Sequence, residues 1–141
     1  MNTLIIVADA SRARIFEAGK NIRKLSELED FIHSESRMTE EELGADAPVK
    51  SANQKGSLQP RSFPKEHEEQ IFASQLAKRL QELHNKIQYA GFILIAPPRF
   101  LGMLRKELPT GIEKLVSRTH DKDLVSLTPA ELGEYLEKTR I

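Results

Sequence analysis

The sequence contains no cysteine and has no net charge, because its 21 basic residues balance its 21 acidic residues. The absence of cysteine excludes a disulfide framework, a thiol nucleophile and a thiolate metal site, and it is typical of a reducing compartment. Zero net charge means that no global field attracts nucleic acid or an anionic membrane. Any charged partner must therefore be bound by a local patch.

Long apolar runs are also missing. The longest candidate, Phe92 to Ala96, is far shorter than the ~20 residues that cross a bilayer. The first residues lack the basic start and long apolar region of a secretory signal, and they fit a strand instead. We therefore expect a cytoplasmic protein without a membrane partner. The length of 141 residues fits a single domain over residues 1–141.

The apolar pattern predicts three strands at the start of the chain. Thr3 to Ala8 is a nearly continuous β-branched and aliphatic run, which is typical of a central strand covered on both faces. Ala13 to Glu17 predicts a second strand and Ile22 to Ile32 a third, joined by hairpin connections. The apolar spacing of the third segment also fits a helix, so both interpretations stay open there.

Residues 33–63 show no apolar periodicity, and glycines and prolines would interrupt any element built there. The sequence therefore predicts a long flexible loop, of the kind that is usually functional or disordered. Its second half is cationic, since no acidic residue occurs between Asp46 and Glu66. We predict that this half contacts a polyanion, most plausibly ribosomal or transfer RNA. The predicted binding residues are Lys50, Lys55, Gly56, Gln59, Arg61 and Lys65.

A long helix should follow the loop. Pro64 suits a first helical turn, and the glutamates after it suit the positive end of a helix dipole. Apolar residues then recur at helical spacing. This predicted stripe comprises Ile71, Phe72, Leu76, Leu80, Leu83 and Ile87.

The last part of the chain predicts alternating strands and helices. Phe92 to Ala96 reads as a buried strand beside and parallel to the first one, and residues 99–108 as a short helix. The last strand is either Leu115 to Thr119 or Leu124 to Leu127. A capping box with proline at its first helical position, Thr128 to Glu131, starts the final helix.

The predicted order of elements is therefore β-β-β-α-β-α-β-α. It indicates an α/β fold with a mixed, mostly parallel sheet of about five strands flanked by helices. Ribonuclease-H-like and related folds share this order, which is an analogy of fold and carries no function.

Two candidate sites lie where the predicted parallel strands end. Asp9 follows the first strand, in the place where a metal-dependent nuclease would keep a carboxylate, but it also suits a cap for the turn after it. The next central strand offers no carboxylate, so we predict no metal-dependent cleavage of nucleic acid, no resident metal and no cofactor. Asp9, Arg12, Arg99 and Arg105 form a possible pocket for a small anion or nucleotide. The alternative is that these arginines form surface ion pairs.

Other potential ligands give weaker signals. Residues 120–123, His-Asp-Lys-Asp, hold three oxygen or nitrogen ligands, but no second histidine completes a zinc motif. Serines lack the strand-turn-helix setting of a nucleophile elbow, and glycine spacing predicts no phosphate-binding loop. Enzyme activity is left open, with binding the favoured class.

Three stretches of the sequence carry a family resemblance. They are Leu4 to Phe16, Phe92 to Arg105 with its Ala-Pro-Pro-Arg-Phe-Leu-Gly-Met-Leu-Arg run, and Lys122 through Leu132. Together they resemble the bacterial host-attachment protein family, the proteins required for attachment to host cells. Without an export signal, any effect of this protein on attachment is expected to be indirect.

That family is in turn similar to the central domain of archaeal and eukaryotic peptide-release factors, whose catalytic Gly-Gly-Gln lies on a long loop before a long helix. Here the corresponding stretch, residues 55–63, reads Lys-Gly-Ser-Leu-Gln-Pro-Arg-Ser-Phe and lacks that tripeptide. The resemblance therefore implies a translation-associated, ribosome- or RNA-binding module without peptidyl-tRNA hydrolysis. A small-anion or nucleotide-binding protein is the alternative.

Overall fold

A computed structural model describes residues 1–32 and 64–139 of this chain. The described residues form one five-stranded mixed sheet with helices on both faces, which confirms the predicted fold class. The predicted loop at 33–63 lies outside the described residues. Its residues connect β3 to α3 in the sequence.

The strands lie in the order β3-β2-β1-β4-β5. β1 (Thr3–Ala8) is antiparallel to β2 (Arg12–Ala18), which is antiparallel to β3 (Ser26–Ile32). β4 (Gly91–Ile95) pairs in parallel with β1 and with β5 (Val116–His120). All strands except β2 therefore point in one direction.

The predicted pairing of the two continuously apolar strands is confirmed. Thr3 lies opposite Gly91 and Val7 opposite Ile95, and the side chains of both strands are buried on each face. Such runs need cover on two faces, which forces them to the centre of the sheet.

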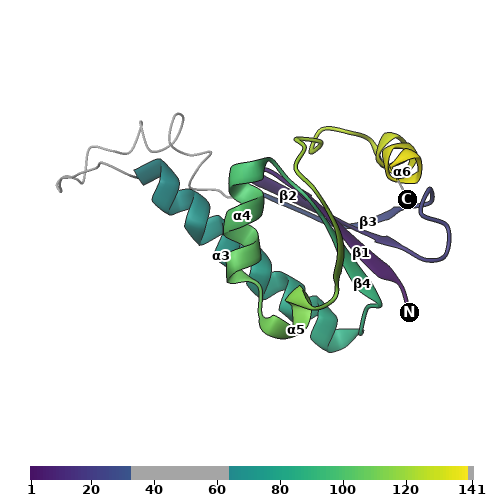
Figure 1. The fold of residues 1–141 in the computed structure, drawn as a ribbon, viewed down its shortest axis with the longest axis horizontal. Helices are drawn as coiled ribbons and strands as arrows, with labels where there is room; N and C mark the ends of the chain where they lie inside the picture. The colour runs from purple at the N-terminus through teal and green to yellow at the C-terminus, as the bar shows by residue number, and fades with distance from the viewer. Residues whose placement is uncertain (33–63, 140–141) are drawn as a thin grey trace.

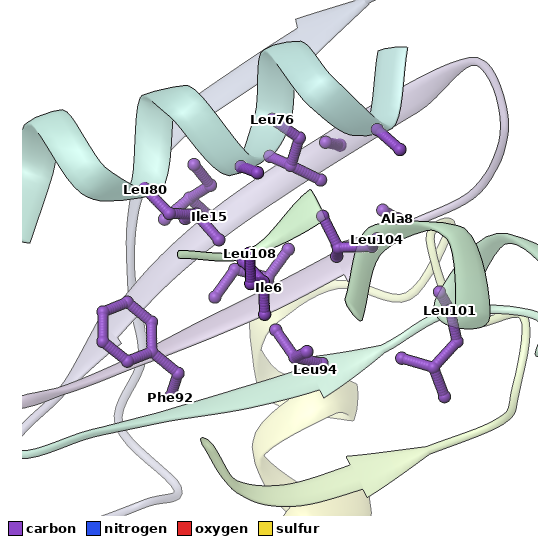
Figure 2. Close-up of a cluster of buried hydrophobic side chains, with 14 of the residues drawn as sticks. Ile6, Ala8, Ile15, Leu76, Leu80, Phe92, Leu94, Leu101, Leu104 and Leu108 are labelled. Atoms are coloured by element: carbon purple, nitrogen blue, oxygen red, sulfur yellow. The ribbon is translucent and has the colours of Figure 1, made fainter. Parts of the chain in front are cut away.

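The helices cover the sheet from both sides. α3 (Pro64–Lys86), α4 (Pro98–Glu107) and the short α5 (Thr110–Glu113) lie on one face, and α6 (Pro129–Lys138) lies on the other. Figure 2 shows Leu76 and Leu80 of α3 packed with Ile6 and Ile15 of the sheet.

The opposite core, under α6, is smaller. Phe16, Ile93 and Ile95 of the sheet pack there with Leu132 and Leu136 of the helix. α6 begins with the predicted capping box: the Thr128 hydroxyl accepts from the amide of Glu131, and the Glu131 carboxylate accepts from the amide of Thr128.

The structure corrects several predicted boundaries. β3 begins at Ser26 rather than Ile22, and its segment is a strand rather than a helix. The last strand is the first of the two predicted candidates, because residues 124–127 instead pack as a connection over the α6 face. Ile87 lies beyond the end of α3 and is 60% exposed, so it does not belong to the buried stripe.

Candidate functional site

The carboxyl ends of β1, β4 and β5 meet at one edge of the sheet. The amide of Ala96, after β4, donates to the carbonyl of His120 at the end of β5, at 3.1 Å. Asp9 follows β1, the neighbour of β4. Ligand crevices of open α/β sheets lie at such an edge, so the predicted Asp9 and Arg99 are placed where a site is expected.

Asp9 caps the turn between β1 and β2. Its Oδ1 accepts hydrogen bonds from the amides of Ser11 and Arg12, both at 2.9 Å, and its own amide donates to the Arg12 carbonyl. The Ser11 hydroxyl donates a third, longer hydrogen bond to the same oxygen, at 3.3 Å. The turn-capping interpretation of Asp9 is therefore confirmed.

Arg12 forms a bidentate ion pair with Asp30 on the neighbouring strand. Nε lies 3.0 Å from Oδ1 and Nη2 lies 2.7 Å from Oδ2. The hydrogen bond from Arg12 lowers the pKa of Asp30, against the smaller opposing effect of desolvation. This guanidinium is thus already engaged by a carboxylate.

Arg99 stands in the first turn of α4, beside the start of α3. Its Nε is 3.7 Å from Oε1 of the buried Glu69, and its Nη2 is 3.8 Å from Oε2 of Glu66. These are long contacts, and the Arg99 side chain is 63% exposed. Arg99 therefore offsets the negative charge at the α3 start and still presents donors to solvent.

Arg105 lies six residues further along α4, about 9 Å along the axis, and pairs with Glu113 of α5 at 2.6 Å. The four residues of the predicted anion pocket thus divide among three contacts: the turn and β3, the start of α3, and α5. Of the three arginines, Arg99 has the longest carboxylate contacts and the most exposed side chain.

All but one of the predicted RNA-binding residues lie outside the part of the chain that the structure describes. Lys50, Lys55, Gly56, Gln59 and Arg61 lie outside the described residues. Lys65 belongs to the first turn of α3, but its side chain lies outside the described part of the structure.

A cluster at the end of β5 contains His120, which the sequence offered only as a weak candidate ligand, together with Arg118 and Tyr135, which sequence reasoning missed. His120 Nδ1 is 3.2 Å from the Tyr135 hydroxyl of α6, and the two rings meet edge to face with centroids 5.4 Å apart. His120 Nε2 and Arg118 Nη1 are buried and have no hydrogen-bond partner.

Burial lowers the pKa of His120, and the Arg118 charge lowers it further, while Asp121 acts in the opposite direction. The sequence signal was the spacing of Arg118 and His120, two residues apart on a strand, which puts both on one face.

Neither a metal site nor a membrane span emerges from the described residues. No group of three or more histidine, aspartate or glutamate side chains there could hold a metal ion. No helix within ranges 1–32 and 64–139 has the length and apolar character to cross a bilayer.

Comparison with known proteins gives the following similarities. The sequence profile of a family described as "Protein required for attachment to host cells" matches residues 4–136. An uncharacterised protein of Rickettsia prowazekii is 37% identical over 73 residues, which is 50% of this chain and 49% of that protein. The alignment thus spans about half the length of this curated relative.

Two solved structures resemble the fold. The crystal structure of an archaeal translation termination factor matches 97% of this chain and 38% of its own, with a TM-score of 0.51 and 11% identity. A Ppx/GppA phosphatase of Aquifex aeolicus matches 84% of this chain and 35% of its own, with a TM-score of 0.44 and 16% identity.

Proposed function

We propose, from the premise that this chain belongs to the family of proteins required for attachment to host cells, that it is a translation-associated module that binds ribosomal or transfer RNA without catalysis. The binding surface proposed is the cationic half of the segment 33–63 together with the start of α3. Any effect on attachment would follow indirectly from this activity.

The observation that carries the proposal is the place of this segment in a fold similar to that of an archaeal translation termination factor. The segment connects β3, which ends at Ile32, to the long helix that begins at Pro64. A long connection before a long helix is also what the resemblance to release-factor central domains implies. The contact between Glu69 and Arg99 puts the start of α3 beside the start of α4.

The charge of the segment supports a polyanionic partner. Lys50, Lys55, Arg61 and Lys65 occur without an intervening acid, and they lead into the positive end of a helix of 23 residues. Phosphate groups bind such lysines and arginines and release counterions, which makes the affinity dependent on salt.

The same segment argues against catalysis. Residues 55–63 contain one glycine and one glutamine, separated by Ser57 and Leu58, in place of the Gly-Gly-Gln of the resembling family. We therefore propose binding to RNA as the activity and expect no hydrolysis of peptidyl-tRNA.

The test is ribosome co-sedimentation over a series of salt concentrations. Lys55→Ala with Arg61→Ala should weaken co-sedimentation and reduce the slope of log affinity against log salt by about two, since each phosphate contact contributes ~0.9. The control is Lys106→Ala with Lys114→Ala, which removes the same charge from exposed positions near α5. It should leave the slope unchanged.

Two results would end the proposal. One is a parent protein that does not sediment with ribosomes at low salt. The other is an equal loss of co-sedimentation in both double variants, which would indicate that the net charge of the protein alone determines its binding to ribosomes. Gln59→Ala separates binding from chemistry: it should leave RNA association intact, and release of peptide from peptidyl-tRNA should be undetectable in the parent.

Small-anion binding at the carboxyl ends of the strands is the second candidate function, and the exposed Arg99 favours it. Its guanidinium stands in the first turn of α4, where free backbone amides also point outward. A thermal-shift screen of nucleotides and phosphorylated metabolites tests it, because a ligand at 100 times its Kd stabilises by ~2.7 kcal/mol. A shift that survives Arg99→Met would argue against this site.

A further inference from the structure

Arg118 differs from every other arginine whose side chain is described. Each of the others lies within 4.0 Å of a carboxylate: Arg12, Arg14, Arg23, Arg79, Arg99 and Arg105. No hydrogen bond or ion pair joins the Arg118 guanidinium to any described residue, and its Nη1 is shielded from solvent. A buried, unpaired guanidinium nitrogen is costly, so it calls for an acceptor.

The strand geometry puts a second unsatisfied group beside it. Arg118 lies opposite Ile93 and His120 opposite Ile95, and both isoleucines face the core under α6. The irregularity between Phe92 and Ile93 shifts the register of β5 so that these two polar residues share that face. The Arg118 charge acts on the His120 imidazole, which agrees with this proximity.

The hydrogen bond with the Tyr135 hydroxyl determines whether Nε2 of His120 is a hydrogen-bond donor or acceptor. When this hydroxyl donates to Nδ1 across 3.2 Å, the neutral imidazole carries its proton on Nε2, the buried and unpartnered nitrogen. Protonated imidazole also carries a proton there. In both forms Nε2 is a donor, on the same face of β5 as the Nη1 donor of Arg118. Two buried donors on one face of a strand, neither with an acceptor, fit an anionic oxygen rather than a cation.

We propose that Arg118 and His120 bind a phosphate-type oxyanion at the edge of the sheet, with Tyr135 as the positioning residue that orients the imidazole. The site shares no residue with the segment proposed to bind RNA, so it goes beyond the proposed function. Arginine supplies paired donors and charge, and histidine supplies a donor whose charge increases when a dianion binds. Because both unpartnered atoms are shielded from solvent, the ligand enters with a local shift of the surrounding chain.

Among the residues that the structure describes, the charged and titratable groups that act on the imidazole are Arg118, Asp121 and Tyr135. In the unliganded protein, burial and Arg118 hold the His120 pKa below its ordinary value. A bound dianion offsets both effects, so binding should raise this pKa. Phosphate affinity should correspondingly increase as the pH falls from 8 to 6, as protons add to the imidazole.

The experiment follows the ring carbon-bound protons of the histidines by NMR during titration with inorganic phosphate at constant ionic strength. His120 should shift saturably and titrate at higher pH with phosphate present. His84, whose Nδ1 accepts from the amide of Tyr89 at 3.1 Å, is the internal control and should not respond. Parallel titrations use adenosine monophosphate for a phosphate ester and acetate for a carboxylate.

Arg118→Met keeps the aliphatic stem and should weaken phosphate binding roughly tenfold or more, since a charged hydrogen bond contributes about that much. Arg118→Lys keeps the charge with a different donor geometry, so its phosphate affinity should lie between those of Arg118→Met and the parent. The matched control is Arg23→Met, which removes the same charge from a 53% exposed side chain that pairs with Glu137 of α6, and it should bind phosphate like the parent. Ribosome co-sedimentation should be unchanged in Arg118→Met, which separates this site from the proposed function.

Several results would overturn the proposal. They are no response of His120 to millimolar phosphate, an equal response to acetate, or a loss of binding in Arg99→Met with none in Arg118→Met. If Arg118→Met fails to fold, Arg118→Lys and His120→Gln decide, because parent-like phosphate affinity in both would refute the site.

Discussion

Replacing Arg14 by methionine should destabilise the protein strongly, because this arginine connects three parts of the chain. Its Nε is 2.9 Å from Oε2 of Glu27 on β3, and its Nη1 donates to the carbonyls of Val125 and Leu127, in the connection that leads to α6. The guanidinium also lies over the ring of Phe16, 4.9 Å from its centroid. The side chain is 9% exposed, so solvent cannot replace these partners.

The magnitude follows from the groups left unpaired. Removing one partner of a buried ion pair costs ~3 to 5 kcal/mol. Glu27 is 29% exposed and regains some water, so about 3 kcal/mol is expected for Arg14→Met. For a domain of this size that loss lowers Tm by roughly 6 to 12 °C.

Urea unfolding followed by circular dichroism measures the loss, with Arg12→Met as the matched control on the same strand. The Arg12 and Asp30 side chains are 38% and 39% exposed, and a surface pair contributes ~1 kcal/mol or less. Amide exchange within 129–138 should also speed up in Arg14→Met and not in Arg12→Met. If both variants lose the same stability, Arg14 does not hold the α6 connection as described.

Two further substitutions test the packing and the electrostatics. Gly133→Ala should destabilise although alanine favours helices, because its Cβ would stand 2.5 Å from the carbonyl oxygen of Arg23; Gly102→Ala, with nothing within 4 Å, should instead stabilise by up to ~1 kcal/mol. Thermal unfolding of the pair shows whether α6 approaches the turn that closely, and equal gains in both would contradict it. The hydrogen bond from Arg79 lowers the pKa of Glu29 below its ordinary 4.5, so this carboxylate contributes stability above that pH that is lost as the pH falls through the folded-state pKa. In Glu29→Gln the free energy of unfolding should therefore fall less steeply below pH 4.5 than in the parent. The same pH dependence in both proteins would refute the contribution of Glu29 to stability.

The sequence by itself determined the central strands and several element starts. The runs at 3–8 and 92–96 are apolar at every position or nearly so, and they are short and rich in β-branched residues, as a strand covered on both faces requires. The start of α6 could also be predicted from the sequence, because Thr128, Pro129 and Glu131 form a local capping pattern whose hydrogen bonds need no other part of the chain.

Local pattern could not determine the extent of some elements. Ile87 continues the spacing of the α3 stripe, yet the helix ends at Lys86 and leaves its side chain exposed. The four residues of α5 are too few to show a helical period, so that turn was not predicted.

Only the tertiary structure decided which charged groups are engaged. Arg14 donates to a carbonyl 111 residues away, and Arg99 contacts a glutamate on α3. No spacing in the sequence specifies such partners, because they depend on strand order and helix placement.

The same limit applied to the cluster at the end of β5. Residues 118 and 120 predict a shared face, but the register irregularity decides which face, and α6 brings Tyr135 to the imidazole. Burial of His120 Nε2 and Arg118 Nη1 is then a property of packing, since a strand alone would leave both atoms in water. Local periodicity therefore determined the elements, and the long-range packing of α6 on the sheet decided which polar groups were left without partners.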